Sequence, residues 1–369
     1  MKPTLVTFTG GWGDTSIERV MASAHEVIAR DTLNTARATD AFDSMVVVTD
    51  SVESLESWGR GVAVELTRPP FHFGRKLWEV VRKYGMESVL YVGGGLPLLS
   101  SQQMVEISHQ LVASKEIVIT NNPYSGDLVG ITPADALERI QLPVIDNALP
   151  QLLSADAGLR SVVLPKDVTT LLDVDTPTDL AVLSMYPCIG PNLRACLKTL
   201  ELDTRELVKV TRLLTDHRAE ILIAGRVGSY VWSQLEEKTA CRCRILSEER
   251  GMRADGRERE GKVRSILGLY MEQVDSGKLF RRLSELGDAA VIDTRVLFSH
   301  MKLSLSASDR FCSDMMRPEE IANPWLREFT QAAQESPIPV VFGGHSLVSG
   351  GLLALIDIAW AGTGLVDKA

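Results

Sequence analysis

The chain lacks several features that would place it in a specialised class of protein. It has five cysteines in 369 residues, an odd number at irregular spacings, which indicates neither a disulfide framework nor a zinc site. No stretch approaches the roughly 18 consecutive apolar residues of a membrane span, and the first residues carry no apolar run typical of a signal peptide. We therefore expect a cytoplasmic protein with no membrane partner.

The chain also lacks an excess of positive charge. It has 39 basic against 48 acidic residues, a formal net charge of -9. Because an acidic surface repels a phosphate backbone, we expect no nucleic-acid partner. The six histidines show no HxH or HxxxH spacing that would indicate a metal site.

What is present is an ordinary globular composition, with 45% hydrophobic and 24% charged residues. The length of 369 residues exceeds one ordinary core, so two domains are expected. Short apolar runs alternate with helical patterns, which predicts an α/β fold: an N-terminal Rossmann-like mixed sheet and a second doubly wound α/β domain. Two prolines and a glycine in residues 186–191 interrupt this pattern, so we place the domains at 1–188 and 189–369.

The expected elements follow from hydrophobic periodicity. Strands are expected at residues 4–9, 45–49, 62–66, 88–92, 116–120, 161–164, 169–172, 221–224, 241–246, 289–292 and 339–342. Helices are expected at residues 16–39, 73–84, 101–114, 176–184, 203–215, 230–237, 262–274, 279–286, 325–334 and 352–360.

Polar and glycine residues gather where the first strands end, which is where open parallel sheets bind ligands. Glycine amides can cradle a phosphate group, and asparagines can read a base or a sugar by hydrogen bonds. For the asparagines, a plain turn is an equal alternative. The candidate ligand-binding residues are Gly10, Gly11, Gly13, Gly94, Gly95, Asn121 and Asn122.

Two segments carry a resemblance to a known family. Residues 172–180, LDVDTPTDL, resemble the closing DxDTPxDL motif of the GT-A type nucleotidyltransferases, and residues 88–99 resemble their metal-bearing strand and turn. That family includes the molybdenum cofactor guanylyltransferases and the 2-phospholactate guanylyltransferases. The resemblance covers about half of the chain and implies a GT-A fold, a nucleotide substrate and a role in cofactor biosynthesis.

Asp173 and Asp175 are the candidate metal ligands and catalytic residues. In extended backbone, residues two apart point the same way, and two carboxylates held together repel unless a cation lies between them. Mg²⁺ suits such a pair when substrate phosphates complete its ligands. The alternative for this pair is helix capping, and we interpret Asp179, in the first turn of a helix, as structural.

The sequence departs from the family pattern in two places. The family carries an aspartate at the position of Gly95, and basic residues in its first glycine loop, where this chain has none before Arg19. A non-catalytic ligand-binding protein with a degenerate metal site is therefore kept as an alternative to an enzyme.

The second half resembles no family that we can name, but it contains two anion-binding patterns. A glycine turn follows the strand at 221–224, and a glycine- and serine-rich segment at 343–351 follows the last strand. Backbone amides at a strand end that opens a helix bind phosphate or carboxylate, and His345 could act as acid or base. The candidate residues are Arg226, Gly228, Ser229, Arg295, Gly343, Gly344, His345, Ser346 and Ser349.

These patterns together predict an enzyme that joins a nucleotide to a phosphate- or carboxylate-bearing small molecule with Mg²⁺ as cofactor. A glycosyltransferase that uses a sugar nucleotide is a second hypothesis. The expected partners are a nucleotide or sugar nucleotide and an anionic small molecule, and a homo-oligomer stays open.

Overall fold

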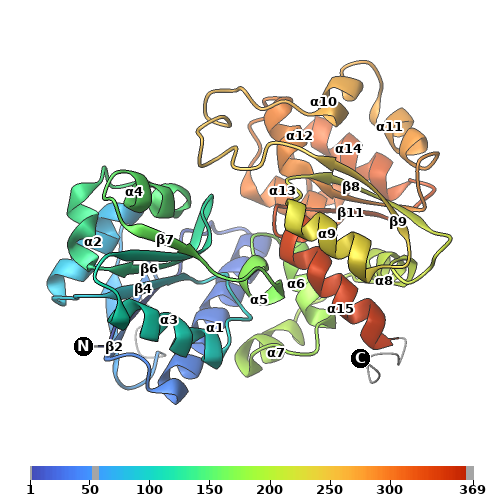
Figure 1. Cartoon of the computed structure of the whole chain (residues 1–369). Coiled ribbons are helices and arrows are strands. Elements are labelled where there is room, and N and C mark those ends of the chain that lie inside the picture. Colours follow the sequence, from blue (N-terminus) through green and yellow to red (C-terminus); the bar gives the residue numbers. More distant parts are fainter. Residues whose placement is uncertain (1, 52–57, 363–369) are drawn as a thin grey trace. The chain divides into compact units, whose positions relative to one another are not determined.

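The computed structural model describes residues 2–51 and 58–362, which form two compact units (Figure 1). Of the described residues, the first unit comprises 2–12, 22–51, 58–170 and 190–196, and the second comprises 13–21, 171–189 and 197–362. Residues 171–189, which carry the DVDTP segment, thus group with the second unit. The expected division after Cys188 stays a prediction about which pieces fold independently.

The first unit is built on a seven-stranded mixed sheet in the order β3-β2-β1-β4-β6-β5-β7. The strand β6 runs antiparallel to both β4 and β5, and the other pairs are parallel. Its strands are β1 Thr4–Phe8, β2 Ser44–Thr49, β3 Val62–Leu66, β4 Val89–Gly93, β5 Ile117–Asn122, β6 Ser125–Thr132 and β7 Arg160–Val163.

Alternate residues of these strands point to opposite faces, and each face is covered by helices. Leu5 and Leu90 share a buried cluster with Leu33 of α1 and Ile107 of α3. Val6 and Tyr91 share another with Leu77 of α2 and Leu153 of α4. The helices are α1 Ser16–Thr39, α2 Phe73–Lys83, α3 Ser101–Ala113, α4 Leu149–Ala155, α5 Val168–Leu171 and α7 Pro191–Leu197, with short 3₁₀ turns at η1 Ala134–Arg139 and η2 Asp146–Ala148.

A buried carboxylate attaches α7 to the first unit. Asp31 of α1 accepts hydrogen bonds from the backbone N–H groups of Asn192, at 3.1 Å, and Leu193, at 2.9 Å. A side chain at Gly190 would overlap this carboxylate, because its Cβ would lie 2.1 Å from Asp31 Oδ2. Asp31 thus satisfies helix N-terminal donors that would otherwise lack a partner.

The second unit holds a four-stranded, wholly parallel sheet in the order β11-β10-β8-β9. Within it, α9 and α15 lie on one side of the sheet in Figure 1, and α12 and α14 lie on the other. Its strands are β8 Glu220–Gly225, β9 Arg242–Ser247, β10 Ala289–Asp293 and β11 Val340–Gly343. Its helices are α6 Pro177–Met185, α8 Arg205–Leu213, α9 Ser229–Lys238, α10 Ile266–Met271, α11 Ser276–Leu283, α12 Thr294–His300, α13 Ala307–Asp314, η3 Pro318–Glu320, α14 Pro324–Gln334, η4 Leu347–Gly351 and α15 Leu352–Gly362.

The predicted α/β class, a mixed N-terminal sheet followed by a second parallel one, is confirmed. One expected strand was wrong. Residues 168–171 form the short helix α5 instead of a strand, because the Asp167 side chain caps its first amides at Thr169 and Thr170. The antiparallel strand β6 was not expected. Within residues 2–51 and 58–362, none of the helices combines the length and apolar character that crossing a membrane would require.

Candidate functional site

The first sheet reverses its strand order between β1 and β4, and two glycine turns meet at that point. β1 is followed by the turn at Gly10 and Gly11, and β4 ends at Gly93. Gly94 N–H donates to Phe8 O at 3.1 Å, and a Cβ at Gly94 would lie only 3.0 Å from the same oxygen. The turn after β4 therefore contacts the end of β1 through its backbone, at the edge of the sheet where open α/β folds bind ligands.

A carboxylate occupies one donor of the predicted phosphate cradle. The backbone N–H of Gly11 donates to Asp50 Oδ2 at 2.8 Å, and Asp50 is the exposed residue that follows β2. Gly10 has a φ of 117°, and a Cβ there would lie 2.3 Å from Asp50 Oδ1. Glycine is thus required at position 10 by both its backbone conformation and its contact with Asp50. A phosphate in this turn would have to displace Asp50 or share a cation with it.

The third glycine of the loop, Gly13, belongs to the second unit and also faces a carboxylate. A Cβ at Gly13 would lie 2.5 Å from Glu18 Oε1. The hydroxyl of Thr15 donates to Glu18 Oε2 at 2.5 Å. This part of the loop is therefore organised by an acidic side chain of the following helix.

The two candidate asparagines stabilise the β5–β6 turn. Asn121 is buried; its Oδ1 accepts the N–H of Leu128 at 3.1 Å, and its Nδ2 donates to Thr170 O at 3.0 Å. Asn122 Oδ1 accepts the N–H of Tyr124 at 3.0 Å. Of the two interpretations left open by the sequence, these contacts favour the turn for Asn121, whose amide groups are already engaged.

An aromatic cluster that the sequence did not point to lies beside the same edge of the sheet. Phe71 is 49% exposed and contacts Phe8 edge to face, with 6.2 Å between ring centroids. Phe8 also contacts Tyr91, whose hydroxyl donates to Asp146 Oδ2 at 3.0 Å. An exposed ring next to a ligand-binding edge is a surface on which a nucleobase can stack. The signal in the sequence was the aromatic pair in Phe71-His72-Phe73, just before α2.

In the second unit, the DVDTP segment packs against the end of β11. Ser346 Oγ accepts the backbone N–H of Asp173 at 3.0 Å, and the Thr178 hydroxyl donates to Phe342 O at 2.7 Å. Asp173 is half-buried and Asp175 is exposed. Across the described residues, no group of three His, Cys, Asp or Glu side chains is arranged to hold a metal ion. A cation at this pair would therefore need oxygen ligands from water or substrate.

The acid at position 179 has the structural role expected for it. Asp179 Oδ2 accepts the N–H of Thr176 at 2.7 Å and that of Asp175 at 3.1 Å, in a capping box at the start of α6. Its other oxygen is buried and has no hydrogen-bond partner among the described residues. Burial, together with the nearby charge of Asp175, raises the pKa of Asp179 to about 8. The buried carboxyl is thus protonated at neutral pH.

The second sheet reverses its strand order between β8 and β10, and an ion pair lies at that point. Arg226 Nε is 2.6 Å from Asp293 Oδ2, and its Nη2 is 3.1 Å from Oδ1. Asp293 is fully buried; burial opposes its ionisation, but Arg226 outweighs this and lowers the pKa of Asp293. Because a carboxylate already engages this guanidinium, Arg226 does not offer an open fork to an anion.

Arg295 is engaged in the same way. Its Nη1 and Nη2 lie 2.7 and 2.5 Å from the two carboxylate oxygens of Asp314, and the side chains are 8% and 0% exposed. Burial lowers the pKa of Arg295, but Asp314 more than offsets this and raises it above its usual value. Asp314 lies at the end of α13, a helix that is not among those expected from the sequence.

The glycine-rich segment after β11 is a wide helical turn rather than the expected loop. Gly351 N–H donates to Ser346 O at 2.8 Å, and so does Ser349 N–H at 3.1 Å. A Cβ at Gly350 would lie 2.1 Å from Leu172 N, so this glycine is required for backbone packing. Gly343 and Gly344 are also close-packed, with Cβ positions 2.9 Å from Leu347 and 3.2 Å from Thr176. Close packing thus explains Gly343 and Gly344, two glycines that were predicted to bind a ligand.

Exposed polar groups lie at the start of α9. Gly228 is the N-cap residue, Ser229 is the exposed first residue of the helix, and the Arg250 side chain lies 3.8 Å from the Cβ position of Gly228. His345 lies in the electrostatic reach of Arg226 and Arg250; burial, with Arg226 acting in the same direction, lowers its pKa to about 4. His345 is therefore neutral at pH 7 and can take part in a hydrogen bond.

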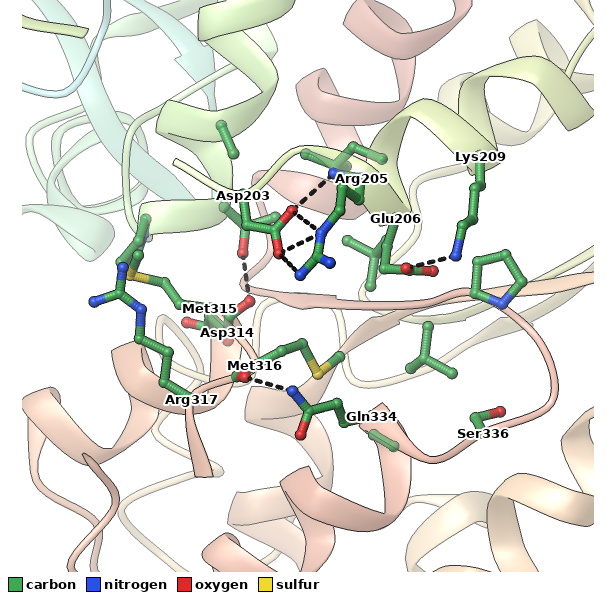
Figure 2. A pocket seen from close by; sticks show the side chains of 18 of the residues that line it. Asp203, Arg205, Glu206, Lys209, Asp314, Met315, Met316, Arg317, Gln334 and Ser336 are labelled. Atoms are coloured by element: carbon green, nitrogen blue, oxygen red, sulfur yellow. Dashed lines mark hydrogen bonds and ion pairs between the residues drawn. The ribbon is translucent and has the colours of Figure 1, made fainter. Parts of the chain in front are cut away.

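A groove of about 490 Å³ lies elsewhere in the second unit, between α6, α8, α14 and β11 (Figure 2). Its charged side chains are largely paired within the protein: Arg205 Nη2 lies 2.6 Å from Asp203 Oδ2, and Lys209 Nζ lies 2.8 Å from Glu206 Oε1. Gln334 donates to Met316 O at 3.4 Å. The groove has the volume of a small-molecule site, but no predicted residue lines it.

No protein-family model matches the sequence, and no curated protein matches it significantly. Among solved structures, a nucleotidyl transferase from a Methanothermobacter species is similar with a TM-score of 0.40 and 16% identity, over 54% of this chain and 99% of the other. A cytidylyltransferase from Leptospira borgpetersenii is similar with a TM-score of 0.39 and 14% identity, over 54% of this chain and 94% of the other. The CMP:2-keto-3-deoxy-manno-octonic acid synthetase complexed with CTP is similar with a TM-score of 0.37 and 14% identity, over 54% of this chain and 100% of the other.

Proposed function

We propose that this chain is a nucleotidyltransferase-like enzyme that binds a nucleotide at the carboxyl edge of the first sheet. The observation that carries the proposal is the contact of Gly94 with the end of β1, just before the Gly10–Gly11 turn, at the switch between β1 and β4. Backbone amides there can contact a ligand once Asp50 leaves the Gly11 N–H or shares a cation with that ligand. The resemblance of residues 172–180 to the DxDTPxDL motif supports the same reaction class.

The nucleobase would stack on Phe71, the exposed ring that contacts Phe8 edge to face. Stacking on one aromatic face tolerates several bases, so base specificity would come from hydrogen-bonding groups nearby. Ser125 is one such group, because its hydroxyl is already oriented by Asp127 Oδ1 at 2.8 Å.

Asp173 and Asp175 would hold Mg²⁺. The donor set fits: two carboxylates of one segment, one of them exposed, leave most positions to water and phosphate oxygens, as Mg²⁺ prefers. The ion would supply charge neutralisation on the phosphate oxygens. Ser346 would keep the metal-binding segment in place through the Asp173 N–H.

The acceptor would be a phosphate- or carboxylate-bearing small molecule. Within the second unit, Ser229, Arg250 and the helix N-terminus at the start of α9 favour negative charge of this kind. An acceptor oxygen would attack the α-phosphorus, the bond to the β-phosphate oxygen would break, and pyrophosphate would leave. A phosphate or carboxylate oxygen is already ionised at pH 7, so His345 would orient the acceptor rather than remove its proton.

A non-catalytic nucleotide-binding protein is the second candidate. It is favoured by Asp50, which occupies the Gly11 N–H, and by Gly95, which offers no metal ligand. A glycosyltransferase that uses a sugar nucleotide at the same edge is a third hypothesis, and its distinguishing product would be a free nucleoside diphosphate.

A thermal-shift panel of nucleoside triphosphates and sugar nucleotides, with and without Mg²⁺, tests binding. Binding to the folded state should raise the Tm. At a ligand concentration 100-fold above Kd, the free energy of unfolding should increase by about 2.7 kcal/mol. Phe71→Ala should abolish the shift, whereas Trp232→Ala, which removes a 55% exposed ring of the second unit, should leave it unchanged. No shift with any nucleotide would contradict the proposal.

Incubation of the shifting nucleotide, labelled in its α-phosphate, with candidate anionic acceptors tests catalysis. A nucleotidyltransferase releases pyrophosphate and transfers the label, and Asp175→Asn should slow this without unfolding the protein. Nucleotide binding without turnover of any nucleotide or sugar nucleotide would favour the non-catalytic alternative.

A further inference from the structure

Two cysteines lie side by side at the outer edge of the second sheet. Cys241 precedes β9 and Cys243 is its second residue, so both side chains point to the same face, with 3.9 Å between their Sγ atoms. Both are free thiols and both are half-buried. β9 is an edge strand, paired with β8 on one side only.

The two thiols have different proton affinities. The hydrogen bond from Cys243 lowers the pKa of Cys241 to about 7, although burial acts against this. The thiol at Cys243 has its pKa raised, because it donates that hydrogen bond and is itself buried. Thr239 Oγ1, 3.6 Å from Cys241 Sγ, is a further partner. Cys241 is therefore the nucleophile of the pair at neutral pH, and Cys243 stays protonated.

We propose that Cys241 and Cys243 form a reversible redox pair, converted to an intramolecular disulfide by exchange with a low-molecular-weight disulfide. This inference is independent of the nucleotide-binding proposal. The two thiols lie at the amino end of β9, whereas the candidate ligand-binding residues of the second unit lie at the carboxyl ends of the strands.

The exchange takes place in two displacements that balance. The Cys241 thiolate attacks one sulfur of the small disulfide, whose S–S bond breaks and releases one thiolate. The Cys243 thiol, losing its proton to that thiolate, then attacks the Cys241 sulfur of the mixed disulfide and releases the second thiolate, which takes a proton from water. The two cysteines lose two electrons in total, and the small disulfide is reduced to two thiols.

To form a disulfide, the two sulfurs must close from 3.9 Å to roughly 2.05 Å. The ladder between β8 and β9 begins at the pair Glu220 and Arg242, so Cys241 lies just outside it. The Arg242 N–H donates to Ala219 O at 2.9 Å and fixes the strand beyond that point. On the other side of Cys241, the Ala240 N–H donates to Leu214 O at 2.9 Å, so the movement that brings the sulfurs together takes place at Cys241, between these two hydrogen bonds.

The test uses the full-length reduced protein, incubated with oxidised glutathione at pH 7.5, quenched with acid and alkylated. Digestion after glutamate places both cysteines in one peptide, residues 238–248. We expect this peptide to become lighter by two hydrogen atoms without a glutathione adduct, and to do so before the exposed Cys188 reacts. Dithiothreitol should reverse the change.

Two variants make the proposal falsifiable. Cys243→Ser should trap glutathione on Cys241, since no second thiol can resolve the mixed disulfide. Cys241→Ser should slow modification of the peptide about tenfold, because the remaining thiol is mostly protonated. Circular dichroism of each variant confirms that it is folded. Stable glutathione adducts on both cysteines of the wild type, or reaction no faster than at Cys188, would overturn the proposal.

Discussion

Ser346 accepts the backbone N–H of Asp173 at 3.0 Å, which joins two segments that lie far apart in the sequence within one unit of the structure. The DVDTP segment and the glycine-rich turn after β11 were predicted to serve separate sites. Their contact means that a change in one is expected to affect the other, and it suggests the first prediction.

Gly350→Ala should destabilise the second unit. A Cβ at this position would lie 2.1 Å from Leu172 N, so the backbone of the DVDTP segment would have to shift. Overpacking of this kind costs about 1–3 kcal/mol or more. Gly362→Ala is the matched control, because nothing lies within 4 Å of its Cβ position at the exposed end of α15. Equal urea midpoints for the two variants would contradict the packing explanation.

Asp179→Asn should change how stability depends on pH. The folded pKa of Asp179, about 8, lies above its ordinary value of 3.8, so the folded state holds a proton that the unfolded chain has lost. The free energy of unfolding should therefore fall as pH rises from about 4 to about 8, by up to about 1.4 kcal/mol per pH unit.

The asparagine variant keeps the acceptor oxygen of the capping box but cannot ionise, so its stability should change less over this range. Urea unfolding at several pH values measures the slope, with the exposed Asp156→Asn as control. If the free energy of unfolding depends on pH equally in the wild type and in Asp179→Asn, groups other than Asp179 cause that dependence.

Arg295→Ala should lower stability by about 3–5 kcal/mol, because it leaves the buried carboxylate of Asp314 without its partner. The double variant Arg295→Ala/Asp314→Ala should recover part of this loss, since it removes the stranded charge as well. A double-mutant cycle by chemical unfolding measures the coupling. Strictly additive losses would show that the pair does not stabilise the fold as a unit.

Asp50→Asn should distinguish two ways in which the first glycine turn could meet a phosphate. If the phosphate replaces the carboxylate on the Gly11 N–H, loss of the charge should tighten triphosphate binding on the order of tenfold without divalent cations. If a cation bridges Asp50 and the phosphate, the same variant should weaken binding in Mg²⁺. Calorimetric titration under both conditions measures this, with the exposed Asp43→Asn as control, and no effect in either condition would place the phosphates elsewhere.

The sequence by itself determined the class of fold and most of its elements. Period-two apolar runs such as those of β1 and β4, separated by helical patterns, specify buried parallel strands because each face must be covered. It also determined the ends of these strands, where Gly10 and Gly94 allow backbone conformations or contacts that other residues would not. The capping role of Asp179 was likewise local, since it depends on residues three and four positions away.

Only the tertiary structure decided which of the polar residues at the strand ends are still open to a ligand. Arg226 and Arg295 looked available in the sequence, but Asp293 and Asp314 neutralise them, and the second of these partners comes from a helix that the sequence did not predict. Asp50 reaches the glycine turn from a neighbouring strand, 39 positions along the chain. Such pairings arise from packing of distant elements, because a buried charge must find its partner wherever the fold places one, and no local pattern encodes that choice.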